Sequence, residues 1–165
     1  MRQDHFKLQT SNFKLKVSVI DQQSKLAIDR PAIVQAVRSV LAEAEIQKAR
    51  VNVVVVDDPT IHDLNRRFLE HDYPTDVLSF PLSTGPKNLE GEIVVSADTA
   101  CQSAGRYGWS AREELLLYII HGTLHLVGYD DHTPRQRAAM RAQERAHLAK
   151  LGCPMPEKKV KRSKK

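Results

Sequence analysis

The sequence predicts an α+β domain in which a small mixed sheet of about four strands packs with about five helices. Segments with strand and helix patterns follow one another in the order β-α-β-α-β-β-α-α-α, with two strands adjacent and three helices at the end. The length of 165 residues fits a single domain, and a hydrophobic content of 41% is enough for a buried core. Because only 5% of the residues are aromatic, we expect this core to be mainly aliphatic.

The first three predicted elements are a strand, a helix and a second strand. Lys14–Ile20 alternates polar and apolar side chains, as a strand with one solvent-facing side does. Arg30–Lys48 has the pattern of an amphipathic helix, with Asp29 as its N-cap and Pro31 in its first turn. Val51–Val56 is β-branched and nearly continuous, which predicts a strand covered on both faces.

The middle of the chain is predicted to contain two helices and two strands. The first helix, Thr60–Leu69, follows an Asp-Asp-Pro sequence that ends the preceding strand. Asp76–Leu82 and Gly91–Ser96 have strand patterns, and the segment between them contains the Gly, Pro and Asn residues of a flexible turn. A short helix, Asp98–Tyr107, follows.

Two longer helices complete the predicted domain. Ser110–Val127 begins with a capping box formed by Ser110 and Glu113, and Gly128 is placed to end it. Pro134–Leu151 has the pattern of a last helix that ends at a glycine.

Three parts are expected along the chain: a loose leader at residues 1–12, one domain at residues 13–153 and a basic, disordered tail at residues 154–165. The tail accounts for the whole net charge of +5, because residues 157–165 contain six Lys or Arg residues and one Glu. The domain itself is therefore neutral overall, and a polyanionic partner would have to be bound by locally placed cations.

No segment predicts export or membrane insertion. The N-terminus lacks the apolar stretch of a signal peptide, and the longest apolar runs are too short to cross a bilayer. Two cysteines, Cys101 and Cys153, are too few for a disulfide scaffold. We therefore expect a cytoplasmic protein with reduced thiols and no membrane partner.

The segment HGTLHLVGYDDH, at residues 121–132, has the pattern of a metal site. His121 and His125 are four residues apart on a predicted helix, so both imidazoles leave the same face. Gly128 ends that helix and allows a third ligand from residues 129–132 to return over the same ion. Three protein ligands and an open position are typical of catalytic zinc, although nickel or copper also accept nitrogen donors.

One absence at this motif bears on the reaction. In helical zinc peptidases the residue after the first His is a Glu that acts as general base, and Gly122 stands there in this sequence. A zinc peptidase of this geometry is thus the less favoured alternative.

The same segment closely resembles the signature of the YbeY proteins, a bacterial family of metal-dependent endoribonucleases that cut single-stranded RNA. The blocks PTDVLSFP (residues 74–81) and GEIVVSADTA (residues 91–100) resemble that family in the same order, and the likeness spans roughly Val17–Leu151. The resemblance implies an α+β fold, a metal held by three His, and a role in maturation of small-subunit ribosomal RNA, especially its 3′ end, and in ribosome quality control.

Two departures from the family pattern affect individual residues. Six residues separate His125 from His132, where the family has five, and Asp131 occupies the family's third-ligand position. We favour His132 as the third ligand and keep Asp131 as the alternative. An Arg of the family is replaced by Leu69. The neighbouring Arg66 and Arg67 are candidate substitutes as phosphate contacts, and a solvated helix face is the alternative for both.

Other residues are assigned weaker roles. Thr75 and Asp76 are expected to brace the site, whereas Ser79 either faces the cleft or is an ordinary strand serine. His62 and His71 are expected mainly at the surface. A positive groove would be built from arginines outside the tail: Arg106, Arg112, Arg135, Arg137 and Arg141.

The expected reaction is hydrolysis of a phosphodiester bond in single-stranded or ribosomal RNA, with His121, His125 and His132 acting through a zinc ion. Water or the 2′-OH of the RNA is the attacking group, and the sequence leaves both open. A second alternative is a non-catalytic ribosome-assembly factor that binds RNA and uses the metal structurally. The sequence does not indicate the cleavage site or the oligomeric state.

Overall fold

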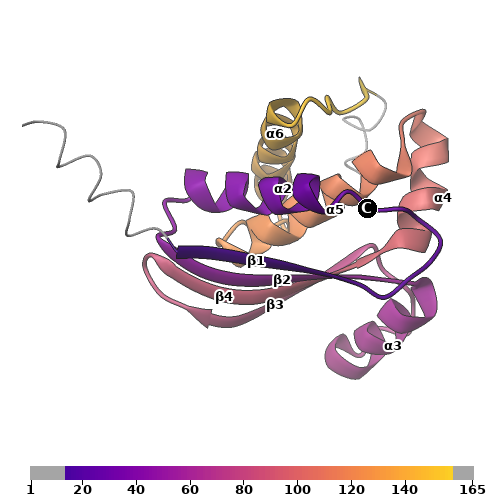
Figure 1. Cartoon of the computed structure of the whole chain (residues 1–165), viewed down its shortest axis with the longest axis horizontal. Coiled ribbons are helices and arrows are strands. Elements are labelled where there is room, and N and C mark those ends of the chain that lie inside the picture. The colour runs from indigo at the N-terminus through magenta and orange to yellow at the C-terminus, as the bar shows by residue number, and fades with distance from the viewer. Residues whose placement is uncertain (1–13, 158–165) are drawn as a thin grey trace, which may run out of the picture.

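Four strands form one mixed sheet in the computed structural model, which describes residues 14–157 (Figure 1). Across the sheet the order is β1-β2-β4-β3. β1 pairs with β2 and β2 with β4 in parallel, whereas β3 is antiparallel to β4. The predicted mixed sheet is thus confirmed. The bounds are β1 (Lys14–Asp21), β2 (Lys48–Val56), β3 (Val77–Thr84) and β4 (Asn88–Ser96).

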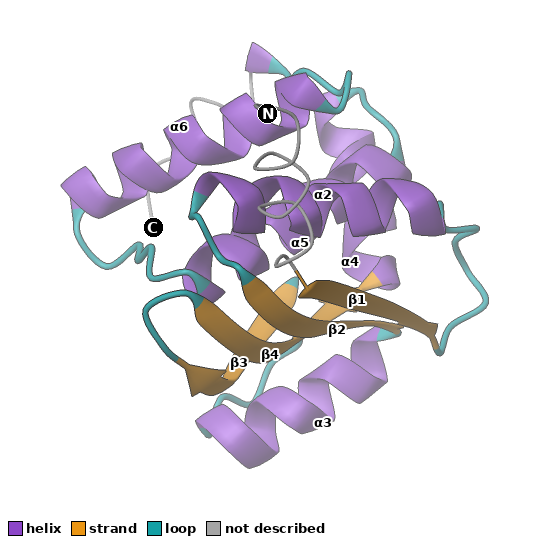
Figure 2. Ribbon diagram, turned by 60° about the vertical axis from the view of Figure 1, so that its left-hand side comes forward, coloured by secondary structure: helices purple, strands orange, loops and turns teal. Residues whose placement is uncertain are grey.

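Five helices cover this sheet within the described residues, as predicted for an α+β fold. They are α2 (Arg30–Glu43), α3 (Asp58–Leu69), α4 (Ala97–Tyr107), α5 (Ala111–Leu126) and α6 (Pro134–Lys150). Figures 1 and 2 show that α2, α5 and α6 lie on one side of the sheet, whereas α3 alone lies on the other. None of the helices at residues 14–157 combines the length and apolar character needed to span a membrane.

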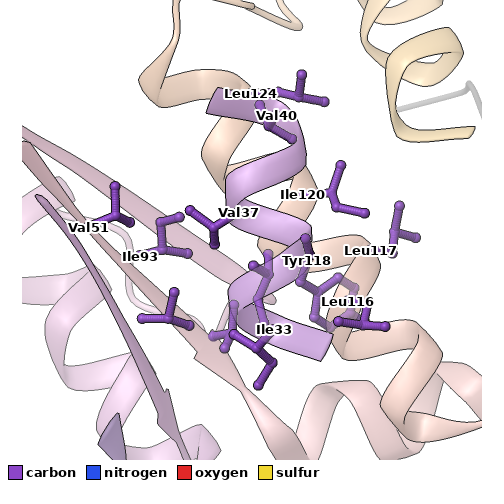
Figure 3. Close-up of a cluster of buried hydrophobic side chains, with 14 of the residues drawn as sticks. Ile33, Val37, Val40, Val51, Ile93, Leu116, Leu117, Tyr118, Ile120 and Leu124 are labelled. Atoms are coloured by element: carbon purple, nitrogen blue, oxygen red, sulfur yellow. The ribbon is translucent and has the colours of Figure 1, made fainter. Parts of the chain in front are cut away.

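The main core lies between the sheet and helices α2 and α5. Figure 3 shows Val37 of α2 beside Val51 of β2 and Ile93 of β4, with Ile120 of α5 nearby. All four of these side chains are fully buried. A smaller cluster under α3 contains Val56, Ile61, Leu78 and Val94. Aliphatic side chains make up most of both clusters, as the composition predicts.

The predicted helix Arg30–Lys48 is too long at its C-terminal end. α2 stops at Glu43, and the next residues turn sharply, with Glu45 at φ +58°. This left-handed conformation ends the helix and aligns Lys48 with Lys14 in the parallel ladder. β2 therefore begins three residues earlier than the predicted strand Val51–Val56.

The prediction that Val51–Val56 is covered on both faces is correct only for the end of the strand. Val51, Val53 and Val55 are buried under α2 and α5, and Val56 is buried near α3. Asn52 is only partly buried, and Arg50, two residues before it, is exposed. α3 is too short to cover the whole second face, so its first half remains open to solvent.

The C-terminal end of the described chain extends the predicted domain slightly. Met155 is buried against the main core, so packed structure continues past Pro154, where the basic tail was expected to begin. The leader at residues 1–12 and the basic residues at 158–165 lie outside the described part of the chain. Cys101 and Cys153 are free thiols.

Candidate metal centre

α5 brings two imidazoles together at its C-terminal end. The helix starts with the predicted capping box of Ser110 and Glu113 and runs through the core. His121 and His125 lie on one face, with 4.7 Å between ring centroids and 3.1 Å between their Nε2 atoms. Two nitrogen atoms this close, facing each other across one turn, form half of a coordination site.

Asp131 adds a carboxylate to this pair. Gly128 adopts φ +105°, and the Tyr129 N–H donates to the Leu124 carbonyl, which folds the chain back over the helix end. Asp131 Oδ2 then lies 3.5 Å from His121 Nε2 and 3.6 Å from His125 Nε2. His121, His125 and Asp131 thus form one group of potential ligands, which we call the triad.

His132, the third ligand favoured from the sequence, lies outside the triad and belongs to a neighbouring group of potential ligands with Asp130 and Asp131. Its side chain is 81% exposed, and its Nε2 faces Asp130 Oδ1 at 3.1 Å. The backbone explains this placement, because the His132 and Thr133 N–H groups both donate to Gln136 Oε1 in the cap of α6. The extra residue in the loop is therefore used to begin α6, and Asp131 stays at the family's third-ligand position.

Glu144 supports the triad from α6, a role that the motif did not reveal. Its Oε1 lies 2.6 Å from His121 Nδ1, on the opposite side of the ring from the triad. A carboxylate there holds Nδ1 as the protonated nitrogen and leaves Nε2 to bind an ion. Glu144 is buried, and its contact with His121 depends on the packing of α6 against α5, for which the sequence gives no local signal.

The electrostatic field at the triad favours a cation. Burial opposes a charge on His121, but the carboxylates of Asp131 and Glu144 outweigh it and raise its pKa to about 10. The hydrogen bond from His121 lowers the pKa of Asp131 to about 2. Glu144 Oε2 is buried without a hydrogen bond and lies 3.4 Å from Arg141. A metal ion bound at the triad would take the place of the proton that the two carboxylates stabilise on His121.

The spacing of the donor atoms also fits a small divalent ion. Zinc–ligand distances of about 2.0 to 2.1 Å place neighbouring ligands of a tetrahedral site roughly 3.3 Å apart. The three separations in the triad are 3.1, 3.5 and 3.6 Å. Two nitrogens and one carboxylate oxygen are donors that zinc accepts.

Gly122 leaves no room for the carboxylate of a zinc peptidase. A Cβ there would lie 2.9 Å from Ser79 Oγ and 3.0 Å from both Val77 and Ile93. Ser79 also donates a hydrogen bond of 2.9 Å to the Gly122 carbonyl. Ser79 is therefore the strand serine that anchors α5 against β3 and β4, and position 122 points into the sheet and away from the triad.

Two cavities that share His121, Arg141 and Glu144 in their lining reach the triad. One has a volume of about 510 Å³ and is lined by His121, Asp131 and one face of α6, including Arg137, Arg141 and Arg145. The other has about 540 Å³ and includes Thr75, Asp76 and Tyr118. Thr75 and Asp76 thus lie next to the site, as expected, and the α6 arginines give the first cavity a positive wall.

The remaining candidates lie away from the triad. Arg66 and Arg67 both pair with Asp63 on the exposed side of α3. His62 pairs with Asp72, and His71 stacks on Tyr73, so both stay at the surface as expected. Arg112 donates to the Ala27 carbonyl at another part of the fold. Neither cavity at the triad is lined by Arg106, Arg112 or Arg135.

Comparisons with known proteins agree with this architecture. A family model described as Endoribonuclease YbeY matches residues 18–152. A Rhodopirellula baltica protein named Endoribonuclease YbeY is 47% identical over 129 residues, which cover 77% of this chain and 66% of the relative. A Pelotomaculum thermopropionicum protein of the same name is 39% identical over 148 residues, covering 83% and 97%. The solution structure of a Thermotoga maritima protein matches with a TM-score of 0.55 at 28% identity, covering 82% and 88%.

Proposed function

The chain belongs to the YbeY family of endoribonucleases, and we propose that it is a metal-dependent hydrolase that cuts single-stranded RNA at the triad. The observation that carries this proposal is the convergence of three ligand atoms beside a cavity with an arginine-lined wall. RNA brings a phosphodiester to be cleaved and neighbouring phosphates that arginines can bind.

The ligands we propose are His121, His125 and Asp131. This set takes the alternative left open by the sequence, because His132 faces solvent while Asp131 Oδ2 lies within 3.6 Å of both imidazoles. Zinc is the ion we favour, and nickel is the next candidate for the same donors. When bound, a divalent ion supplies Lewis-acid polarisation of a phosphoryl oxygen and lowers the pKa of water.

The chain's own residues orient the substrate and the ligands. Glu144 fixes the tautomer of His121 by accepting from Nδ1. Arg137, Arg141 and Arg145 follow one another at intervals of four residues on α6, so they present a row of cations along the first cavity. We assign them to the phosphates that flank the scissile bond, where guanidinium groups stabilise the charge that develops at phosphorus. This role replaces the tentative contacts of Arg66 and Arg67.

We further propose that the RNA is the small-subunit ribosomal RNA, processed at its 3′ end in the cytoplasm, and that the protein acts in ribosome quality control on the small subunit. The family membership supports this assignment. The six cations of residues 158–165 would add attraction to any folded RNA, independent of its sequence.

The deciding experiment combines metal analysis with RNA cleavage for the wild type and a His121→Ala/His125→Ala variant. We expect the wild type to carry about one zinc per chain and to cut single-stranded RNA, and the variant to lose both properties. A variant that loses metal but cuts at the wild-type rate would refute cleavage at the triad, whereas a wild type that binds metal and RNA without cutting would favour the non-catalytic alternative. Analysis of the product ends then identifies the attacking group, because a 2′,3′-cyclic phosphate is formed only when the 2′-OH attacks.

A further inference from the structure

A second cluster of cations lies on the open half of the sheet, away from the triad. Lys14 and Lys16 of β1 and Lys48 and Arg50 of β2 are all exposed. The parallel register pairs Lys14 with Lys48 and Lys16 with Arg50, so the four side chains form a two-by-two array on one face. We call these four residues the sheet patch.

The sheet patch and the triad lie on opposite faces of the sheet. Side chains alternate along β2, so Ala49 and Val51 point into the core with α2 and α5 while Lys48 and Arg50 point the other way. The triad residues His121 and His125 belong to α5 on the core side. α3 covers only the far half of the patch face, over Val54 and Val94 (Figures 1 and 2). The sheet patch is therefore a separate surface.

The surroundings of the sheet patch are polar and slightly hollowed. The four cations share a depression of about 430 Å³ with Ser83, Asn88 and Glu90. No ion pair or side-chain hydrogen bond of the four cations is found among residues 14–157. Glu90 and Glu92 on β4 bound the array on one side, and Ser18 and Asn52 continue it. Such a surface offers charges and hydrogen-bond donors, and the exposed Ile20 lies beyond Ser18 on the same face of β1.

We propose that the sheet patch binds the sugar-phosphate backbone of a single RNA strand. Neighbouring cations lie roughly 4.8 Å apart across the strands and 6.6 Å apart along them, an array suited to several phosphates of an extended polyanion. A protein interface would need an apolar centre, whereas the centre of the sheet patch consists of four charged side chains. This inference rests on the proposed RNA substrate. A long RNA would contact the sheet patch with one part of its backbone while its scissile bond lies at the triad.

The test uses the full chain and two matched double variants, each of which removes two positive charges. Lys16→Gln/Arg50→Gln alters the sheet patch, and Arg66→Gln/Arg67→Gln alters the exposed side of α3. Fluorescence anisotropy measures the binding of a labelled oligouridylate in chelator at several salt concentrations. The oligouridylate has roughly 32 nucleotides, twice the upper single-strand site size of about 16. Cleavage of an oligouridylate of about 5 nucleotides is measured separately with zinc restored.

We expect the patch variant to bind the long RNA more weakly, with a salt slope shallower by about 1.4, because each lost phosphate contact removes about 0.7. The α3 variant should keep the wild-type slope, and both variants should cut the short RNA at the wild-type rate. Lys14→Gln/Lys48→Gln, which removes the other row, should reproduce the slope change and exclude a folding defect of one variant. An unchanged slope in the patch variants, or an equal loss in the α3 variant, would overturn the proposal. A wild type that cuts no RNA would refute the proposed function, while the binding data still decide on the sheet patch.

Discussion

Replacement of Asp131 should remove most of the metal affinity, whereas replacement of His132 should leave it intact. Asp131 Oδ2 lies 3.5 and 3.6 Å from the two imidazole nitrogens, while the His132 side chain is 81% exposed and faces Asp130. Asp131→Ala thus reduces the ligands from three to two. His132→Ala changes only a surface contact.

The expected magnitudes differ widely. Changes to residues that merely support a ligand weaken metal binding by about 10- to 100-fold, so loss of a ligand should reach at least about 100-fold, or about 2.7 kcal/mol. A surface substitution such as His132→Ala should stay within about 0.5 kcal/mol, which is roughly twofold. Removal of the Asp131 carboxylate also lowers the pKa of His121, so protons compete less with zinc for this imidazole. This effect alone would strengthen zinc binding and thus acts against the predicted loss of affinity. A large loss would therefore reflect coordination itself.

The assay is competition with a chromogenic zinc chelator at fixed pH and ionic strength. Thermal unfolding of both variants in excess chelator serves as the control for folding. The reasoning would be refuted if His132→Ala lost tenfold or more in affinity while Asp131→Ala remained within twofold of the wild type. In that case the loop would have to rearrange on metal binding and release the cap of α6 at Gln136.

Four further outcomes are expected. Glu144→Gln should weaken zinc binding by about 10- to 100-fold in the same competition assay, because it no longer fixes the tautomer of His121. Arg145→Gln should lower kcat/KM for RNA cleavage about tenfold without changing zinc affinity. This loss corresponds to the lower end of the free energy that a hydrogen bond to a charged group contributes. Truncation after Glu157 removes six cations, so it should weaken RNA binding mainly at low salt, with the salt slope shallower by up to about 4, and leave metal binding and cleavage of short RNA unchanged. Burial lowers the pKa of His147 from its ordinary value of 6.5, so below pH 6.5 the unfolded chain binds more protons than the folded chain. The free energy of unfolding in chelator should therefore fall as the pH decreases through 6.5, and this fall should be less steep in His147→Gln.

The elements of the fold could be predicted from the sequence because local signals mark them. Asp29, Asp57 and Ser110 all accept the N-cap hydrogen bonds that their positions predict. The end of α2 was predicted wrongly because the left-handed turn occurs at Glu45, a residue that gives no signal for positive φ. The prediction that β2 is covered on both faces was wrong for its first half for another reason. This coverage depends on the length and placement of α3, which cannot be predicted from the sequence of one strand.

The site was predictable to the extent that it is local. The helical spacing of His121 and His125 requires only the geometry of one helix. The third ligand depends on how the loop after Gly128 is divided between the metal centre and the cap of α6, and the structure assigns His132 to the cap side. Glu144 and the α6 arginines reach the site only through tertiary packing, so their contacts with the triad could not be read from sequence spacing.

Gly122 connects the packing of the domain to the type of chemistry that the triad can support. Its missing side chain lets α5 approach β3 and β4 so closely that a Cβ would meet Ser79, Val77 and Ile93 at 2.9 to 3.0 Å, short of an ordinary contact. The hydrogen bond from Ser79 to the Gly122 carbonyl fixes the helix at this depth. The two flanking imidazoles, one residue before and three residues after Gly122, are thereby held at a defined height above the sheet. The same contact turns position 122 away from the ion, so a general base like that of a zinc peptidase would have to displace the sheet before it could reach a substrate. The close approach that gives the site its rigidity is therefore also what separates it from peptide hydrolysis.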